Sequence, residues 1–525
     1  MTLQTTTPAR VRLDLILGRE IALLDLREEG PFAADHPLFA ANLPLSRLEL
    51  EAWDRIPRRD VRIVLYDAGE GLAATAAERL EALGYADVTE LAGGLEGWRR
   101  AGYELFQDVN SASKAFGELV EARRHTPSTP APEAKRLIES EPNLVVLDAR
   151  RFEEYQTMSI PRGVSVPGAE LVLRARELAP NPATTIIVNC AGRTRSIIGA
   201  QSLINAGLPN PVLALRNGAI GWTLAGQRLE HGRGERFPEV APEREAEARA
   251  AARRVAYRAG VRRLDRPSLE ALVQDTSRTL YRFDVRTPEE YAAGHLPGFQ
   301  SAPGGQLVQE TDVFAPVRGA RIVLADERGV RADMSASWLA QMGWEVYVLE
   351  GGFEAGLIVG PWRPRHPQPP EAQTISPVEL AAELDRNAAT LIDLAPSPAH
   401  RRGHIPGAWF AVRSRLANAL GVLPGGRPFV LTSPDGELAR FAAADLEALS
   451  GRPPRVLAGG TDAWKTAGLP IETGLPHAAS ADDDVYRRPY EGTDNSKAAM
   501  QAYLDWEFGL VEQLERDGTH GFYVI

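Results

Sequence analysis

The stretch that decides the fold is residues 184–196, which read Thr184-Thr185-Ile186-Ile187-Val188-Asn189-Cys190-Ala191-Gly192-Arg193-Thr194-Arg195-Ser196. Its apolar, β-branched run predicts a buried strand, and a helical pattern begins directly after the short loop that follows. We therefore expect Cys190 between the carboxyl end of a strand and the N-terminus of a helix. This position favours an anion, because backbone N–H groups and the helix dipole point toward it.

Cys190 is the only cysteine among the 525 residues. A single cysteine excludes an intrachain disulfide framework and any multi-cysteine zinc or iron–sulfur site within one chain, and it fits a reducing compartment. An isolated cysteine often serves only as a small buried apolar residue. Here the arginines at positions 193 and 195 favour the thiolate instead, which is the reactive form.

The composition is typical of a globular protein with several domains, since 44% of the residues are hydrophobic and 25% are charged. No apolar run approaches the ~20 residues that span a bilayer. The N-terminal segment 1–8 has no basic region followed by an apolar core, so we expect no signal peptide. The net charge of −11 argues against nucleic acid or an anionic membrane as a partner. We expect a cytoplasmic protein.

An internal repeat accounts for most of the chain, with a period of roughly 100–130 residues, which is domain-sized. Each copy opens with an apolar strand that ends in an aspartate. A second apolar strand then runs into a loop and a helix, and a third strand ends in a glycine-rich turn. The opening strands end at Asp25, Asp148, Asp284 and Asp393. Strands that alternate with helices at this spacing predict a parallel sheet covered by helices on both faces.

The repeat and the segments between its copies predict seven parts. These are the domains 1–106, 129–236, 263–366 and 372–475, the helical linkers 107–128 and 237–262, and a C-terminal tail, 476–525. We expect Pro242–Arg258 to be an exposed connecting helix, residues 361–370 to be a stiff proline-rich spacer, and residues 478–484 to be mobile.

The tail carries an amphipathic pattern that predicts one final helix. Its apolar residues recur at spacings of three and four, and they are Met500, Tyr503, Leu504, Phe508, Val511 and Leu514. We expect this apolar face to dock on a domain of the chain or on a second chain.

Several short motifs identify the repeated unit. Two turns read Gly294-His295-Leu296-Pro297-Gly298 and Gly403-His404-Ile405-Pro406-Gly407-Ala408, and copy two opens with Asp148-Ala149-Arg150 followed by Glu154-Tyr155. Together with the strands, these motifs resemble the rhodanese family of sulfurtransferases, four times over, across most of residues 10–475. The resemblance implies an α/β protein of tandem rhodanese-like domains, each a mostly parallel sheet with helices on both faces. Copy two lacks the histidine of the turn, so we interpret this histidine as structural.

Comparison of the four equivalent loops predicts that only copy two is catalytic. Cys190 corresponds to Asp67, Asp326 and Ser433 in the other copies. Aspartate and serine are good helix N-caps, and aspartate also gains from the helix dipole. Ser433 lacks the Gly-x-Ser-x-Gly pattern of a hydrolase nucleophile. Copies one, three and four are therefore expected to be non-catalytic.

The resemblance implies a ping-pong reaction. Cys190 would take the outer sulfur of thiosulfate or another small anionic sulfane donor as a persulfide and pass it to cyanide or a thiol. Arg193 and Arg195 would hold the anion, together with the loop backbone at Ala191, Gly192, Thr194 and Ser196. We expect Asp148 and Arg150 to support the loop, and we expect no metal and no cofactor.

Two alternatives remain open at this point. Cysteine phosphatases use a Cys-x5-Arg loop, whereas Cys190 and Arg195 form the shorter pattern Cys-x4-Arg, which resembles the sulfurtransferase loop. The other alternative is a sulfur carrier or scaffold, in which the cysteine-less copies bind partners and Cys190 exchanges sulfur with a protein donor or acceptor. The sequence leaves the physiological donor and acceptor, the oligomeric state and the arrangement of the domains undetermined.

Overall fold

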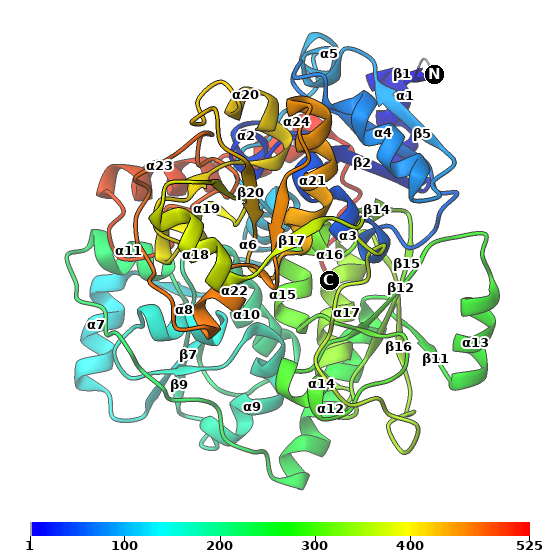
Figure 1. Ribbon diagram of the computed structural model, residues 1–525. Coiled ribbons are helices and arrows are strands. Elements are labelled where there is room, and N and C mark those ends of the chain that lie inside the picture. Colours follow the sequence, from blue (N-terminus) through cyan, green and yellow to red (C-terminus); the bar gives the residue numbers. More distant parts are fainter. Residues whose placement is uncertain (1–2) are drawn as a thin grey trace.

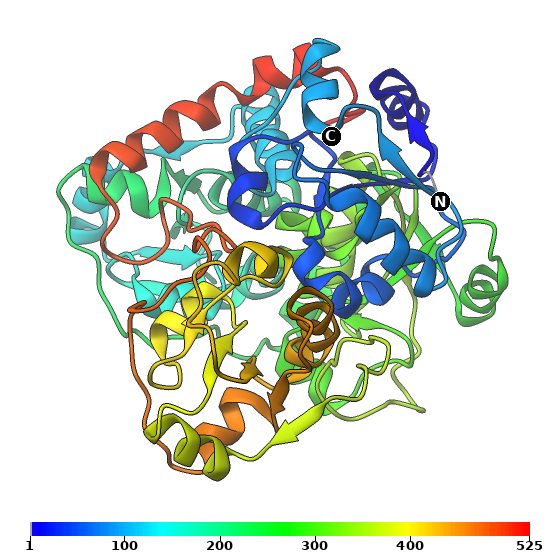
Figure 2. The ribbon, with the colours of Figure 1, turned by 45° about the horizontal axis from the view of Figure 1, so that its top comes forward.

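The computed structural model describes residues 3–525 and contains four successive α/β domains (Figure 1). Domains one to four cover residues 5–100, 128–224, 262–349 and 373–466. One further helix follows each of the first two domains, and two helices lie near the C-terminus. Figures 1 and 2 show domain two (cyan) beside domain three (green), and domain four (yellow to orange) beside domain one (blue).

The elements of domain one and the helix after it alternate along the chain as predicted. They are β1 (Thr5–Thr6), α1 (Pro8–Ile16), β2 (Ile21–Asp25), α2 (Glu29–Ala34), β3 (Ala41–Asn42), the 3-10 turn η1 (Leu45–Arg47), α3 (Leu48–Arg55), β4 (Ile63–Tyr66), α4 (Leu72–Ala82), β5 (Val88–Leu91), α5 (Gly94–Arg100) and α6 (Ser111–Arg124).

Domain two repeats this order and carries the cysteine. Its elements and the helix after it are β6 (Ser128–Thr129), α7 (Ala131–Ser140), β7 (Leu144–Asp148), α8 (Phe152–Thr157), β8 (Gly163–Ser165), the 3-10 turn η2 (Gly168–Glu170), α9 (Leu171–Leu178), β9 (Thr185–Asn189), α10 (Thr194–Asn205), β10 (Val212–Leu215), α11 (Gly218–Leu224) and α12 (Pro242–Arg258). The five strands are parallel, in the order β6-β10-β9-β7-β8.

Domain three departs from the repeat after its last strand, since residues 351–360 form no helix after the Gly351-Gly352 turn. Its elements are β11 (Arg262–Leu264), α13 (Arg266–Gln274), β12 (Leu280–Asp284), α14 (Pro288–Ala293), β13 (Gln300–Ser301), α15 (Gly304–Gln309), α16 (Thr311–Phe314), β14 (Val317–Arg318), β15 (Arg321–Ala325), α17 (Val330–Gln341) and β16 (Glu345–Leu349).

Domain four and the tail complete the chain. Their elements are β17 (Gln373–Ile375), α18 (Pro377–Asp385), β18 (Thr390–Asp393), α19 (Ser397–Arg402), β19 (Trp409–Phe410), the 3-10 turn η3 (Arg413–Arg415), α20 (Leu416–Ala419), β20 (Phe429–Thr432), α21 (Glu437–Ser450), β21 (Arg455–Leu457), α22 (Gly460–Thr466), α23 (Lys497–Phe508) and α24 (Leu510–Asp517). Parallel sheets with alternating helices in all four domains confirm the predicted fold class.

The opening strand of each domain ends in aspartate for a local reason. In domain two the Asp148 carboxylate accepts the backbone N–H of residue 150 at 3.1 Å, and the same turn forms after Asp25, Asp284 and Asp393. Such a turn satisfies a backbone donor just where the ladder of the sheet stops. The repeated aspartate therefore marks the carboxyl edge of every sheet, where ligands of α/β domains bind.

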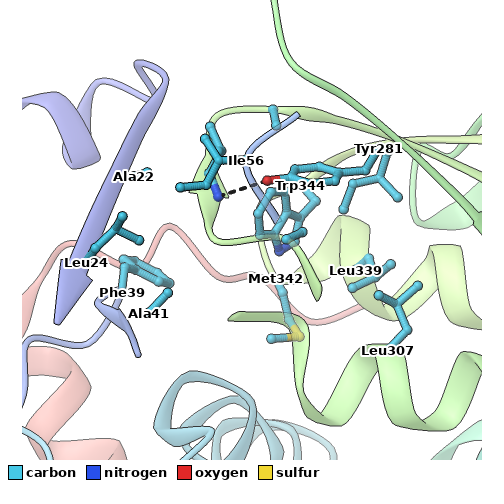
Figure 3. Close-up of a cluster of buried hydrophobic side chains, with 14 of the residues drawn as sticks. Ala22, Leu24, Phe39, Ala41, Ile56, Tyr281, Leu307, Leu339, Met342 and Trp344 are labelled. Carbon is cyan, nitrogen blue, oxygen red and sulfur yellow. Dashed lines mark hydrogen bonds between the residues drawn. The ribbon is translucent and has the colours of Figure 1, made fainter. Parts of the chain in front are cut away.

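Domains one and three share both a sheet and a core. The domain-three strand β14 pairs antiparallel with β2, Val317 opposite Ala22. Apolar side chains of both domains pack in one buried cluster (Figure 3), in which Leu24 and Phe39 come from domain one and Leu339 and Trp344 from domain three. Burial of this apolar area joins the two domains as firmly as a core joins a single domain.

Ion pairs join the other domains. Arg331 of domain three bonds Glu170 of domain two at 2.9 Å, and Arg413 of domain four bonds Glu49 of domain one at 2.8 and 2.9 Å. All four side chains are nearly buried, so each charge depends on its partner for compensation.

Two sequence expectations about the connecting segments are wrong. Helix α12 is not simply exposed, because its alanine face is buried against domains two and three, where Ala248, Ala251 and Ala252 pack. Residues 478–484 are held in place: the Asp483 carbonyl accepts the N–H of Gly30, and Asp484 accepts the N–H of Ser397 at 2.9 Å. Helix α12 packs closely because its alanine side chains are small. Residues 478–484 are fixed because Asp483 and Asp484 accept hydrogen bonds from backbone N–H groups of other segments.

The tail forms two helices instead of one, and α23 ends before Gly509. The predicted apolar stripe therefore splits. Met500, Tyr503 and Leu504 pack on the Cys190 loop of domain two, whereas Leu514 joins the core shared by domains one and three. Figure 2 shows the two helices (red) lying across the top of the molecule. The docking partner is a domain of this chain.

Candidate active site

Cys190 lies where the sequence predicts, between strand β9 and helix α10. Strand β9 is the middle strand of its sheet and is buried, so its carboxyl end is fixed in position. The Cys190 thiol is 1% exposed, and its Sγ lies 3.5 Å from the hydroxyl of Ser196. That hydroxyl in turn donates to the Arg193 carbonyl at 2.8 Å. The loop thus holds the sulfur against the first turn of α10.

The predicted stabilisation of the thiolate is wrong for this closed arrangement. Burial raises the pKa of the Cys190 thiol, because desolvation disfavours the charged form. The positive charge of Arg195 and hydrogen bonds from Ser196 lower this pKa, but they do not offset burial. Burial of the closed site therefore favours the thiol over the thiolate.

Arg195 is the cationic side chain that acts on the sulfur. Its guanidinium makes two hydrogen bonds to the Glu154 carboxylate, at 2.7 and 2.9 Å. This pair holds the pKa of Glu154 well below its usual range. Arg195 also borders a cavity of about 170 Å³ between domains two and three. The arginine is thus fixed beside Cys190 with space next to it, whereas its predicted contact with the donor stays a prediction.

The contacts of Arg193 differ from the predicted ones, because its guanidinium binds side chains of the protein. Its guanidinium bonds both carboxylate oxygens of Glu118 at 2.8 Å and contacts Glu121 and the Asn217 side chain. It also lies 4.2 Å from the centre of the Phe508 ring. Arg193 therefore ties the loop to α6 and α23, and its donor groups are engaged by protein. Sequence periodicity could not show this, because Glu118, Glu121 and Phe508 lie 72 to 315 residues away along the chain.

Asp148 and Arg150 hold the end of the strand that leads into the loop. Arg150 makes hydrogen bonds to both Asp148 oxygens, at 2.9 and 2.7 Å, and to the Met158 carbonyl at 2.6 Å. Asn189, the residue before the cysteine, donates to Asp148 at 3.0 Å. These side chains are buried, and together they fix the end of β9 relative to β7.

The residues that replace cysteine in the other domains cap their helices. Asp67 accepts backbone N–H groups of Gly69 and Leu72 at 2.8 and 2.6 Å, and Asp326 accepts that of Arg331 at 2.8 Å. Ser433 accepts the N–H of Ala439 at 3.3 Å. In these three domains, a side-chain oxygen accepts hydrogen bonds from loop amides equivalent to those that would surround a sulfur anion in domain two. This is the expected behaviour of a helix-capping residue.

The turn histidines are structural in their contacts. Nδ1 of His295 lies 2.9 Å from the Tyr291 carbonyl, and Nδ1 of His404 lies 2.9 Å from that of His400. Both rings are buried, and each stacks on a ring of the preceding helix. In domain two, Ser159 makes the equivalent backbone bridge to Glu230 without a histidine.

The C-terminal segment covers the catalytic loop, which the sequence did not assign to the site. Tyr490, Met500, Tyr503 and Leu504 form a buried cluster with Ala191 of the loop. Lys114 of α6 helps to hold the C-terminal segment in place. Its Nζ bonds Asp108 at 2.7 Å and lies 5.2 Å from the centre of the Tyr503 ring. The apolar stripe of the tail was the only sequence signal for this contact, and it named no partner.

Residues 3–525 lack two further kinds of feature. No helix in this range is long and apolar enough to cross a membrane. No group of three or more His, Cys, Asp or Glu side chains in the same range could hold a metal ion.

Comparisons with known proteins agree with the repeat. The rhodanese-like domain matches residues 11–101, 130–225, 267–357 and 376–467. A solved structure, thiosulfate sulfurtransferase from Pseudomonas aeruginosa, is 61% identical with a TM-score of 0.98, and the match covers all of both chains.

Two curated relatives match parts of the chain. Thiosulfate sulfurtransferase GlpE from Pseudoalteromonas translucida (strain TAC 125) is 32% identical over 76 residues, which are 14% of this chain and 68% of GlpE. The HTH-type transcriptional regulator Rv0324 of Mycobacterium tuberculosis is 32% identical over 111 residues, which are 19% of this chain. The chain spans 46% of the length of that regulator.

Proposed function

Because this chain belongs to the rhodanese-like domain family, which matches four of its segments, we propose that it is a sulfurtransferase in which Cys190 carries the transferred sulfur. The observation that carries the proposal is the position of the only cysteine. It occupies the strand-to-helix loop of domain two, where the other three domains have a helix-capping oxygen. Only domain two therefore offers a nucleophile at this place.

The transfer has two steps, and each exchanges one sulfur–sulfur bond for another bond to sulfur. The Cys190 thiolate attacks the outer sulfur of thiosulfate or a similar sulfane donor. The sulfur–sulfur bond of the donor breaks, its electron pair leaves with sulfite, and a Cys190 persulfide remains. Cyanide or a thiolate then attacks the outer sulfur of the persulfide, and the bond to Cys190 breaks to restore the thiolate. No metal or cofactor takes part in this scheme.

The surroundings of Cys190 suit a small anion. The first backbone N–H groups of α10 lie at the loop, and Arg195 adds a charge held in place by Glu154. Burial of the site lowers the local dielectric, so these interactions are stronger there than in water. Because the thiol is 1% exposed, a small donor reaches it more readily than a protein donor does.

The proposal is tested with the full chain, thiosulfate and cyanide. Wild type should turn over in the steady state, and Cys190→Ser should lose this activity. Activity that persists in Cys190→Ser would overturn the assignment. Turnover that requires a protein sulfur donor would favour the carrier alternative, in which the cysteine-less domains bind partners.

A further inference from the structure

A cavity of about 380 Å³ lies between domains one and three, away from the Cys190 loop. Strand β12 and the turn before β13 form one part of its wall, and residues 358–365 form another. Asp54 and Pro57 of domain one complete the lining, and domain two contributes none of it. The volume falls in the range of small-molecule sites, which is about 300–1,000 Å³. The cavity therefore has room for a small ligand.

The cavity lies where domain three departs from domains two and four. In those two domains the chain after the last helix returns to the edge strand of the sheet and forms a parallel bridge with it. These bridges join Ser165 with Arg236 and Phe410 with Ala478. In domain three, Ile358 bridges to His295, and the described chain shows no later bridge to the edge strand β13. The chain continues as the spacer 361–370, and the start of this spacer lines the cavity.

Arg282 of β12 brings an uncompensated positive charge to this cavity. Across residues 3–525, no carboxylate forms an ion pair with its guanidinium. Burial and the positive charge of Arg365 lower the pKa of Arg282. The acid in the lining, Asp54, is engaged by Arg365 at 2.7 Å. A partly buried cation without a partner is unfavourable, so an anion in the cavity would gain a favourable contact with Arg282.

The turn before β13 holds the guanidinium of Arg282 in position. Gly298 of this turn has a φ of +76°, and a methyl group placed on it would lie 2.7 Å from both terminal nitrogens of Arg282. The guanidinium also lies 6.0 Å from the centre of the Phe299 ring. An anion would therefore meet a cation that is already packed in place, which lowers the ordering cost of binding.

The segment 358–363 adds apolar surface and a second arginine. Ile358 and Val359 line the cavity with exposed apolar side chains, and Val359 is 75% exposed. Trp362 lines it as well, with a half-buried side chain. Arg363 is exposed at the same cavity and forms no ion pair within the described chain. An organic anion satisfies both features, because its apolar body leaves water and its charge is paired.

We propose that this cavity is a binding site for a small organic anion, whose acidic group bonds Arg282 and whose apolar body packs on Ile358, Val359 and Trp362. The net charge of the chain is −11, so the arginines at this cavity give a local preference for anions that the chain as a whole lacks. The site gives domain three, which has no cysteine, a binding function of its own. It goes beyond sulfur transfer at Cys190 and does not depend on it.

The test measures binding of phenyl phosphate to the full chain by isothermal titration calorimetry. Inorganic phosphate and phenol represent the acidic group and the apolar body separately. Wild type should bind phenyl phosphate saturably and at least about tenfold more tightly than either part. Arg282→Gln should weaken this binding about tenfold, because it removes a charge-assisted hydrogen bond. Val359→Glu places a negative charge at an exposed position of the wall and should weaken the binding at least about tenfold.

The controls separate this site from general charge effects and from the Cys190 site. Arg386→Gln, at an exposed arginine after α18 that does not line the cavity, should bind as wild type does. Cys190→Ser should also bind as wild type does, whatever its sulfurtransferase activity. Thermal melts check that Arg282→Gln and Val359→Glu are folded. Absence of saturable binding to wild type, or equal affinities in wild type and both of these variants, would overturn the proposal.

Discussion

The substitution Leu504→Ala should make Cys190 more accessible to small reagents, while the residues proposed to take part in sulfur transfer stay unchanged. Leu504 lies on α23, is 1% exposed and packs in the cluster that holds the tail on the catalytic loop. Replacement of a buried leucine by alanine costs about 2–5 kcal/mol, from lost transfer energy and the cavity left behind. Because this side chain belongs to the docked tail, the cost should fall mainly on docking.

The expected size of the effect follows from this cost. If the thiol reacts only when the tail has lifted, its labelling rate is proportional to the open fraction. A loss of about 2 kcal/mol, the lower bound, then raises the rate about 30-fold, since about 1.4 kcal/mol is a factor of ten.

The assay is alkylation of the native protein by a small thiol reagent, followed by intact mass. The result is unambiguous because the chain has one cysteine. Leu449→Ala, at a side chain of α21 that is 48% exposed, is the matched control and should label at the wild-type rate. If Leu504→Ala keeps its thermal melt and labels as slowly as wild type, the tail does not control access to Cys190.

Three further predictions follow from the loop and from domain one. Arg195→Ala should raise KM for thiosulfate about tenfold and change persulfide stability less; an unchanged KM would assign Arg195 to structure. Arg193→Ala should cost about 3–5 kcal/mol in urea unfolding, because it leaves the buried Glu118 unpaired; an unchanged stability with a raised KM would restore its predicted role in donor binding. Burial lowers the pKa of His36 to about 4, whereas the unfolded residue titrates near 6.5. The unfolded chain therefore binds more protons between these values, and His36 should remove about 2 kcal/mol of stability as the pH falls from neutral to about 5. His36→Gln should lack this component, and equal losses in wild type and variant would refute the assignment.

Much of the fold could be predicted because its signals are local. The β-branched run before Cys190 and the aspartate-ended strands each act through their own sheet, and the hydrogen bonds of Asp148 and its equivalents close within two residues. Likewise, Asp67 and Asp326 cap helices that start within five residues of them. Residue type and spacing are sufficient for such features.

The electrostatics of the site could not be predicted, because they depend on distant partners. Arg193 is engaged by Glu118 and Glu121 on α6, and Arg195 is held by Glu154 on α8. Burial raises the pKa of the Cys190 thiol, and the residues that pack on its loop include Tyr503 of α23, more than 300 residues later in the chain. The loop alone suggested two free arginines and a thiolate, whereas the folded chain pairs both arginines with glutamates and covers the sulfur.

Intact mass of the full chain shows directly whether Cys190 carries the transferred sulfur. After incubation with thiosulfate and removal of excess donor, wild type should gain the mass of one sulfur atom, and cyanide should remove it. Cys190→Ser should gain nothing under the same conditions. An unmodified wild-type mass in protein that turns over thiosulfate, or the same gain in Cys190→Ser, would contradict the account.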